Sequence, residues 1–113
     1  MQQIVGAMQA HPELVAGTDR CCTAAMLAHQ GLAVKTGAEG VFAAIAPASG
    51  VAIALKIDDG ATRAADASLG AVLRKLDVID DAQYESMQRW YSPPIKNSQG
   101  AVVGRLTPSQ IWQ

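Results

Sequence analysis

The residues best suited to chemistry run from Lys35 to Gly40, read KTGAEG, and lie between two stretches with a strand pattern. A lysine at the end of a strand, followed by a hydroxyl and glycines, is typical of an anion site. The ammonium supplies charge, and glycines let backbone N–H groups approach a ligand. The same groups could polarise a carbonyl by stabilising an oxyanion. A surface hairpin in which Lys35 pairs with Glu39 is the alternative, and spacing alone favours it.

Other polar groups carry weaker signals. Cys21 and Cys22 are adjacent, which opposes a disulfide between them, and no CxxC spacing or nearby histidine pair indicates zinc. We therefore expect two small buried residues on a helix, with a metal or redox role as the alternative. His29 falls late in the same predicted helix, where the helix dipole favours a cation. Residues 58–60 (DDG) are expected to form a turn, flanked by Lys56, which could hold its carboxylates.

A complete nucleophilic site is not visible. The sequence has no GxSxG elbow, no phosphate-loop glycine pattern and no SxxK motif, since none of its serines is followed by lysine three residues later. The residues present therefore predict at most part of a catalytic site that works through a nucleophile and a base.

Periodicity and turn residues predict the elements that would position these groups. Helices are expected over residues 2–10, 20–30 (capped by Thr18 or Asp19), 61–76, and from a cap at Asp80 or Asp81 to about residue 89. In the helix over 61–76 the apolar residues form one continuous stripe of Ala65, Leu69, Val72, Leu73 and Leu76. Strands are expected over residues 32–36, 40–46, 51–57 and 101–106. Residues 12–17 are expected to be a connector, 90–94 a break and 96–100 a turn. This order predicts an α+β fold, or a mixed α/β layer, with an antiparallel sheet flanked by helices.

The stretch 51–57 is the clearest strand. Its large apolar residues alternate with small or polar ones: Val51, Ile53, Leu55 and Ile57 against Ala52, Ala54 and Lys56. Because both sets are mostly apolar, we expect a sheet that is covered on both sides. The short link after residue 46 favours an antiparallel hairpin.

Composition sets the broad class. The chain has 113 residues, a net charge of −1 and 50% hydrophobic residues, which predicts a single domain over residues 1–113. No basic excess indicates nucleic-acid binding. No apolar run approaches the ~20 residues of a membrane span, and no secretory signal is visible, so we expect a cytoplasmic protein. Aromatic residues make up only 4%, so the core is thin and we expect it to rely on a partner or on another part of the protein.

Several strings, in order along almost the whole chain, match one known family. They are HPELVAG at 11–17, Arg20, Thr23, KTGAEG at 35–40, IALKI at 53–57, Asp59-Gly60, Arg63-Ala64, Pro94-Ile95, Asn97, Gly100 and Val103-Gly104. With these strings the chain resembles the asparaginase II family, which comprises the rhizobial-type, thermolabile L-asparaginases. The match is to the C-terminal third of that family.

The resemblance implies a fold like the C-terminal part of serine β-lactamases and glutaminases. It also implies an amidohydrolase acting on L-asparagine, with glutamine as the open alternative. Lys35 of the KTG-like motif would be the catalytic lysine, which either lowers the pKa of a nucleophilic serine or holds the substrate carboxylate. Thr36, Gly37, Ala38 and Glu39 would line the substrate pocket.

The resemblance also implies what this chain lacks. In the family the nucleophilic serine belongs to an SxxK motif near the N-terminus, and a zinc site uses cysteines in the N-terminal and central parts. Neither motif occurs here, and Cys21 and Cys22 do not match the zinc ligands, so we expect no cofactor in this chain. The chain alone is therefore expected to be inactive.

The expected partners are the missing N-terminal portion, whose helices would cover one face of the sheet, and a second copy in a homodimer. Two alternatives come from other classes. One is a stand-alone module that binds an amino acid without catalysis. The other is a domain that self-associates through an exposed sheet face.

Overall fold

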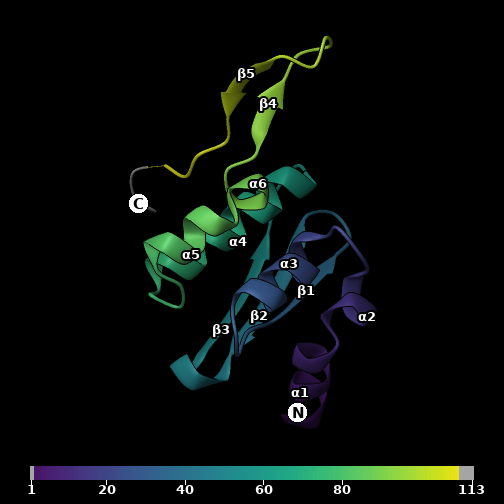
Figure 1. The fold of residues 1–113 in the computed structure, drawn as a ribbon, viewed down its shortest axis with the longest axis vertical. Helices are drawn as coiled ribbons and strands as arrows, with labels where there is room; N and C mark the ends of the chain where they lie inside the picture. Colours follow the sequence, from purple (N-terminus) through teal and green to yellow (C-terminus); the bar gives the residue numbers. More distant parts are fainter. Residues whose placement is uncertain (1, 110–113) are drawn as a thin grey trace.

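The computed structural model describes residues 2–109, so Met1 and residues 110–113 of the expected domain lie outside the described residues. Six α-helices and two small antiparallel sheets form an α+β fold, as the sequence predicts (Figure 1). The elements are α1 (Gln2–Ala10), α2 (Pro12–Ala16), α3 (Cys21–Ala28), β1 (Ala33–Gly37), β2 (Val41–Ala46), the 3-10 helix η1 (Pro47–Ser49), β3 (Val51–Lys56), α4 (Thr62–Lys75), α5 (Asp81–Ser86), α6 (Gln88–Tyr91), β4 (Pro94–Lys96) and β5 (Val102–Arg105).

The larger sheet has the strand order β1-β2-β3, and each neighbouring pair is antiparallel. The turn residues Pro47 to Gly50 close the predicted hairpin between β2 and β3, and Gly50 adopts the left-handed conformation (φ 66°) that glycine tolerates best. Because β2 lies in the middle, β1 has one edge that pairs with no strand among residues 2–109.

One face of this sheet packs on α3 and α4 to form the core. The predicted stripe on α4 is confirmed in part: Ala65, Leu69 and Leu73 are buried and Val72 is half-buried, whereas Leu76 at its end is exposed. The buried residues of this core are Cys21, Cys22, Ala25, Met26, Leu32, Val34, Phe42, Ala44, Ala46, Ala65, Leu69, Leu73, Ile79, Tyr84, Met87 and Tyr91. Few of them are aromatic, so alanine and aliphatic side chains supply most of the contact between the layers.

The opposite face of the sheet corrects one prediction. Cross-strand partners share a face, and the row Lys35–Ala43–Ala54 lies on the side away from the core. All three of these side chains are exposed, as are Ala52 and Lys56 on the same face. On the same face Ala33 is buried and Ile45 is half-buried, so within residues 2–109 this side of the sheet is only partly covered. Small side chains at these positions leave a smooth outer face from which Lys35 projects. We call this surface the alanine face.

The N-terminal half also departs from the predicted connector. Residues 12–16 form α2, because Pro12 occupies the first turn of a helix, where its missing N–H is tolerated. Gly17 ends α2 with φ 88°. The next helix begins at Cys21 with Arg20 at its N-cap and no side-chain cap, so neither Thr18 nor Asp19 caps it. Asp19 pairs instead with Arg89, at 2.6 Å.

The C-terminal part shows three further differences. The helix expected to run to about residue 89 breaks at Met87 into α5 and α6, so residues 90 and 91 are helical. Asp80 does cap α5, in a capping box with Gln83. Residues 94–96 form β4, which pairs with β5 in a separate ribbon that projects from the body (Figure 1). A strand of only three residues that begins with proline gives almost no periodic signal.

Within residues 2–109 no helix is long and apolar enough to cross a membrane.

Candidate functional site

The KTGAEG segment forms the end of β1 and the tight turn into β2. Glu39 and Gly40 both have positive φ, 64° and 71°. A Cβ on Gly40 would come within 2.9 Å of the Ile57 Cβ, so only glycine fits this approach. The Ile57 N–H donates to the Gly40 carbonyl at 3.0 Å. The Lys56 ammonium donates to the Glu39 carbonyl at 2.7 Å. The turn is therefore held in shape by the end of β3.

Lys35 is presented to solvent from the alanine face. Its Nζ donates to the carbonyl of Thr36 at 2.8 Å, which is a local contact. No ion pair joins Lys35 and Glu39, both of which are described, so the alternative of a paired surface hairpin is wrong. The Thr36 hydroxyl donates to the Val41 carbonyl at 3.3 Å across the hairpin. Among residues 2–109 the Lys35 ammonium therefore takes part in no ion pair.

A cavity of about 420 Å³ brings the predicted site residues together. It is lined by Arg20, Lys35, Thr36, Gly37, Ala38, Glu39, Gly40, Thr62 and Ala65. Lys35 and Thr36 point to opposite faces of β1, so this cavity follows the free edge of the strand. The segment predicted from the sequence therefore lines one pocket, together with groups from the starts of α3 and α4.

A second, smaller cavity of about 190 Å³ adjoins the first. It is lined by Asp19, Arg20, Cys21, Cys22, Thr36, Phe42, Thr62, Asp66 and Trp90. Arg20, Thr36 and Thr62 line both cavities. We refer to the two together as the β1-edge cleft. Its polar groups come from β1, the N-terminus of α3 and the first turns of α4.

Burial controls the charges in the smaller cavity. It raises the pKa of Asp66 to about 6, although a hydrogen bond from Cys21 and the charge of Arg20 both oppose this rise. Burial also raises the pKa of the Cys21 thiol, and the neighbouring Asp66 carboxylate adds to that rise. Burial likewise raises the pKa of the Cys22 thiol, although a backbone hydrogen bond from Thr36 and the charge of Lys35 both oppose this rise. The two thiols are therefore protonated at neutral pH.

These residues do not fit a zinc site. Zinc takes thiolate and imidazole ligands in tetrahedral sets, and raised thiol pKa values oppose thiolate formation. Cys21 faces Asp66, whereas Cys22 faces Thr36. Among residues 2–109, no group of three or more His, Cys, Asp and Glu side chains could hold a metal ion. The buried, helical interpretation of both cysteines is confirmed.

The remaining candidates of the sequence have structural roles. His29 is not an exposed cation at a helix end: it is buried, its Nε2 lies 3.0 Å from the Tyr91 hydroxyl, and burial lowers its pKa. The turn at residues 58–60 is confirmed, since the Asp59 carboxylate accepts from the Ala61 N–H at 2.9 Å. Lys56 holds backbone carbonyls there and not the carboxylates.

Arg20 and Asp66 were not predicted as site residues. Arg20 stood only among the family-like strings, and Asp66 lay off the apolar stripe of its helix. The usable signal was the position of Asp66 four residues after Thr62, which places both on one side of α4. Only the packing of α4 against α3 brings that side to the end of β1.

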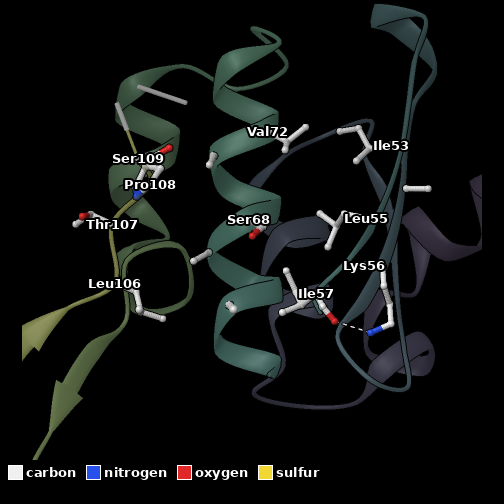
Figure 2. Close-up of a pocket in the computed structure, with 14 residues that line it drawn as sticks. Ile53, Leu55, Lys56, Ile57, Ser68, Val72, Leu106, Thr107, Pro108 and Ser109 are labelled. Atoms are coloured by element: carbon white, nitrogen blue, oxygen red, sulfur yellow. Dashed lines mark hydrogen bonds between the residues drawn. The ribbon is translucent and has the colours of Figure 1, made fainter. Parts of the chain in front are cut away.

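A larger groove of about 590 Å³ lies elsewhere, between β3, α4 and residues 106–109 (Figure 2). Ile53 and Leu55 point into it from β3, Ile57 from the residue that follows β3, and Val72 from α4. Its one charged lining residue, Lys56, turns its ammonium to the Ile57 carbonyl. The lining is mostly apolar, with the hydroxyl groups of Ser68, Thr107 and Ser109 as its other polar side chains, and it contains none of the predicted site residues.

Comparison with known proteins gives one result. The model of the family described as L-asparaginase II matches residues 1–108. No curated protein shows a significant match to the chain.

Proposed function

Because the chain belongs to the L-asparaginase II family, we propose that it is a segment of an amidohydrolase that converts L-asparagine to L-aspartate and ammonia. Within this proposal, residues 1–113 correspond to the C-terminal third of a rhizobial-type enzyme. Lys35 is its catalytic lysine, and Thr36, Gly37, Ala38 and Glu39 line the substrate pocket.

One observation carries the proposal. Lys35 projects from the edge strand of the alanine face, beside a cleft, and forms no ion pair with any residue from 2 to 109. An exposed, unpaired ammonium on a rigid strand is a suitable device for stabilising negative charge in a reaction. Its strand is fixed by the β1–β2 register and by the turn at Gly40.

The reaction needs a nucleophile that these 113 residues do not present in an SxxK motif. A serine hydroxyl from the N-terminal portion would attack the side-chain amide carbon, its proton passing to a base and the carbonyl oxygen becoming an oxyanion. As this intermediate collapses, the base returns the proton to the leaving nitrogen and ammonia departs. Water then hydrolyses the resulting ester to aspartate and restores the serine hydroxyl. The Lys35 ammonium would lower the pKa of that serine or bind the substrate carboxylate. The alanine face is where we expect this portion to pack.

The test measures ammonia release from L-asparagine by the chain alone and by the chain joined to an N-terminal portion that carries SxxK. We expect no turnover from the chain alone and turnover from the joined protein. Lys35→Ala in the joined protein should reduce kcat about a hundredfold to a thousandfold, the usual effect of removing an oxyanion-stabilising group.

Lys75→Ala is the matched control, because Lys75 is an exposed lysine on α4 that lines neither cavity of the β1-edge cleft. Near-normal turnover in Lys35→Ala would contradict the role given to Lys35. Lys35-independent binding of asparagine without turnover, even in the joined protein, would point to a binding module instead.

A further inference from the structure

The β1-edge cleft contains two groups of opposite charge that do not neutralise each other. Arg20 and Asp66 both line the smaller cavity of about 190 Å³. Within residues 2–109 the only ion pair joins Arg89 and Asp19. The guanidinium of Arg20 and the carboxylate of Asp66 therefore do not form an ion pair with each other. They interact only through space, which lowers the pKa of Asp66 slightly against the effect of burial.

Arg20 is free to accept an anion. It stands at the N-cap of α3, it is exposed, and it makes no ion pair or side-chain hydrogen bond with any residue from 2 to 109. A guanidinium presents a planar set of N–H donors that matches a carboxylate in two parallel hydrogen bonds. Thr36 and Thr62 line the cavity beside it and offer hydroxyl groups. The position can therefore take the carboxylate of a ligand.

Asp66 lies deeper, beneath the N-terminus of α4. Its carboxylate is partly buried, and its described contact is the Cys21 thiol. A half-buried carboxylate without a cation is costly, and a ligand ammonium would offset that cost. The other groups that interact with it are Arg20, the two thiols and the hydroxyl of the buried Tyr91, none of which supplies a contacting positive charge.

We propose that Arg20 and Asp66 bind the head group of an α-amino acid. The guanidinium of Arg20 would take the α-carboxylate and the carboxylate of Asp66 the α-ammonium. The side chain of the ligand would then extend into the larger cavity, toward Lys35. This assignment rests on the proposed function, because it takes the ligand to be the amino-acid substrate. It leaves Lys35 to act at the reacting amide and not at the α-carboxylate.

The test is a calorimetric titration of the folded 113-residue chain with three ligands. L-asparagine carries both head-group charges, succinamate lacks the ammonium, and 3-aminopropanamide lacks the carboxylate. We expect the chain to bind L-asparagine at least about tenfold tighter than either analogue, because each charge-assisted hydrogen bond contributes a factor of about ten to a hundred.

Two substitutions then separate the two charges. Arg20→Met should weaken L-asparagine binding about tenfold or more, so that L-asparagine no longer binds more tightly than 3-aminopropanamide. Asp66→Asn should leave the carboxylate contact in place, but L-asparagine should no longer bind more tightly than succinamate. Arg63→Met is the matched control, since Arg63 is an exposed arginine near Thr62 that lines neither cavity, and it should bind like the parent. Circular dichroism shows whether each variant is folded.

The inference is overturned if the parent chain does not prefer L-asparagine over its analogues. It is equally overturned if Arg20→Met keeps that preference. Its failure is distinguishable from that of the proposed function, because binding requires no turnover. If the chain binds L-asparagine selectively but the joined protein does not hydrolyse it, only the proposed function is wrong. If hydrolysis depends on Lys35 but Arg20→Met leaves KM unchanged, only the head-group assignment is wrong.

Discussion

At the scale of single residues, the adjacent cysteines show how one short segment connects two parts of the site. Cys21 contacts Asp66 on α4, and Cys22 receives a backbone hydrogen bond from Thr36 on β1. Both thiols are buried, and both have raised pKa values. They therefore act as small packed groups with weak hydrogen-bonding capacity, and not as nucleophiles. Their position fixes how the start of α3 meets the KTG strand.

The titration of Asp66 predicts a measurable pH dependence of stability. Its pKa is about 6 in the folded chain and 3.8 when unperturbed, so between these values the folded state binds more protons than the unfolded state. The stabilisation of the folded state by this carboxyl group is fully present below about pH 4 and is lost as the pH rises through 6. Asparagine cannot ionise, so the stability of Asp66→Asn should not fall in this way, and the variant should gain stability relative to the parent between pH 4 and 7. Urea unfolding across that range measures it.

His29 acts in the opposite direction and does not disturb this comparison. Burial lowers its pKa, so its contribution to stability is lost as the pH falls below 6.5, equally in parent and variant. The exposed Asp58→Asn is the control for the loss of any carboxylate. Identical pH profiles for the two variants would show that the burial of Asp66 does not matter.

At the scale of elements, the packing of α4 against α6 depends on one glycine. A Cβ on Gly70 would lie 2.2 Å from the Tyr91 Cγ, so the tyrosine ring occupies the space that a side chain would need. Tyr91 is fully buried, and its hydroxyl meets the buried His29 ring. The non-helical backbone of Met87 separates α5 from the short helix α6, which ends with Tyr91. Gly70 therefore serves close helix contact, and its φ is not in the left-handed region.

Gly70→Ala should destabilise the chain by about 1–3 kcal/mol or more, because overpacking forces Tyr91 or the helix to shift. Alanine favours helix formation over glycine by up to about 1 kcal/mol, so the steric effect must exceed that gain. Thermal or urea unfolding gives the value. Gly6→Ala in α1 is the matched control, since nothing lies within 4 Å of its added Cβ, and it should be neutral or stabilising. A stable Gly70→Ala variant would contradict the close contact.

At the scale of the whole molecule, the alanine face is the feature that most needs a partner. It presents Ala43, Ala52 and Ala54 beside Lys35 and Lys56, and all five are exposed. Two copies meeting symmetrically through this face would bring like charges together, which opposes association. We propose instead that this face packs against the N-terminal portion that carries the nucleophile. A homodimer through another surface stays a prediction that sedimentation can check.

Ala54→Glu should separate folding from assembly. Ala54 is exposed, so the free energy of unfolding of the chain alone should change by no more than about 0.5 kcal/mol. Packing of the N-terminal portion on this face would bury the new carboxylate, so asparagine turnover of the joined protein should be lost. Ala82→Glu, at an exposed alanine of α5, is the control and should keep turnover. Full activity in Ala54→Glu would move the assembly surface elsewhere.

The sequence alone determined features that depend on neighbouring residues. The β2–β3 hairpin, the apolar stripe of α4, the Asp80 cap and the tight KTG turn were all predictable, because alternation, helical spacing and turn residues act locally. Its family-like strings also indicated Lys35 before any cleft was visible. Two short elements were not predictable, because each begins with proline and is too short to show a periodic pattern. They are α2, with five residues, and β4, with three.

Only the tertiary structure decided which face of the sheet stays open and what meets Lys35 at its edge. The apolar pattern of β3 is the same whether one face or both are covered, so burial depends on which helices pack there. Arg20 and Asp66 are 46 residues apart in the chain (66 minus 20) and line one cavity because α3 and α4 pack on the same side of the sheet. Such contacts arise from packing between distant segments, which leaves no periodic trace in the sequence.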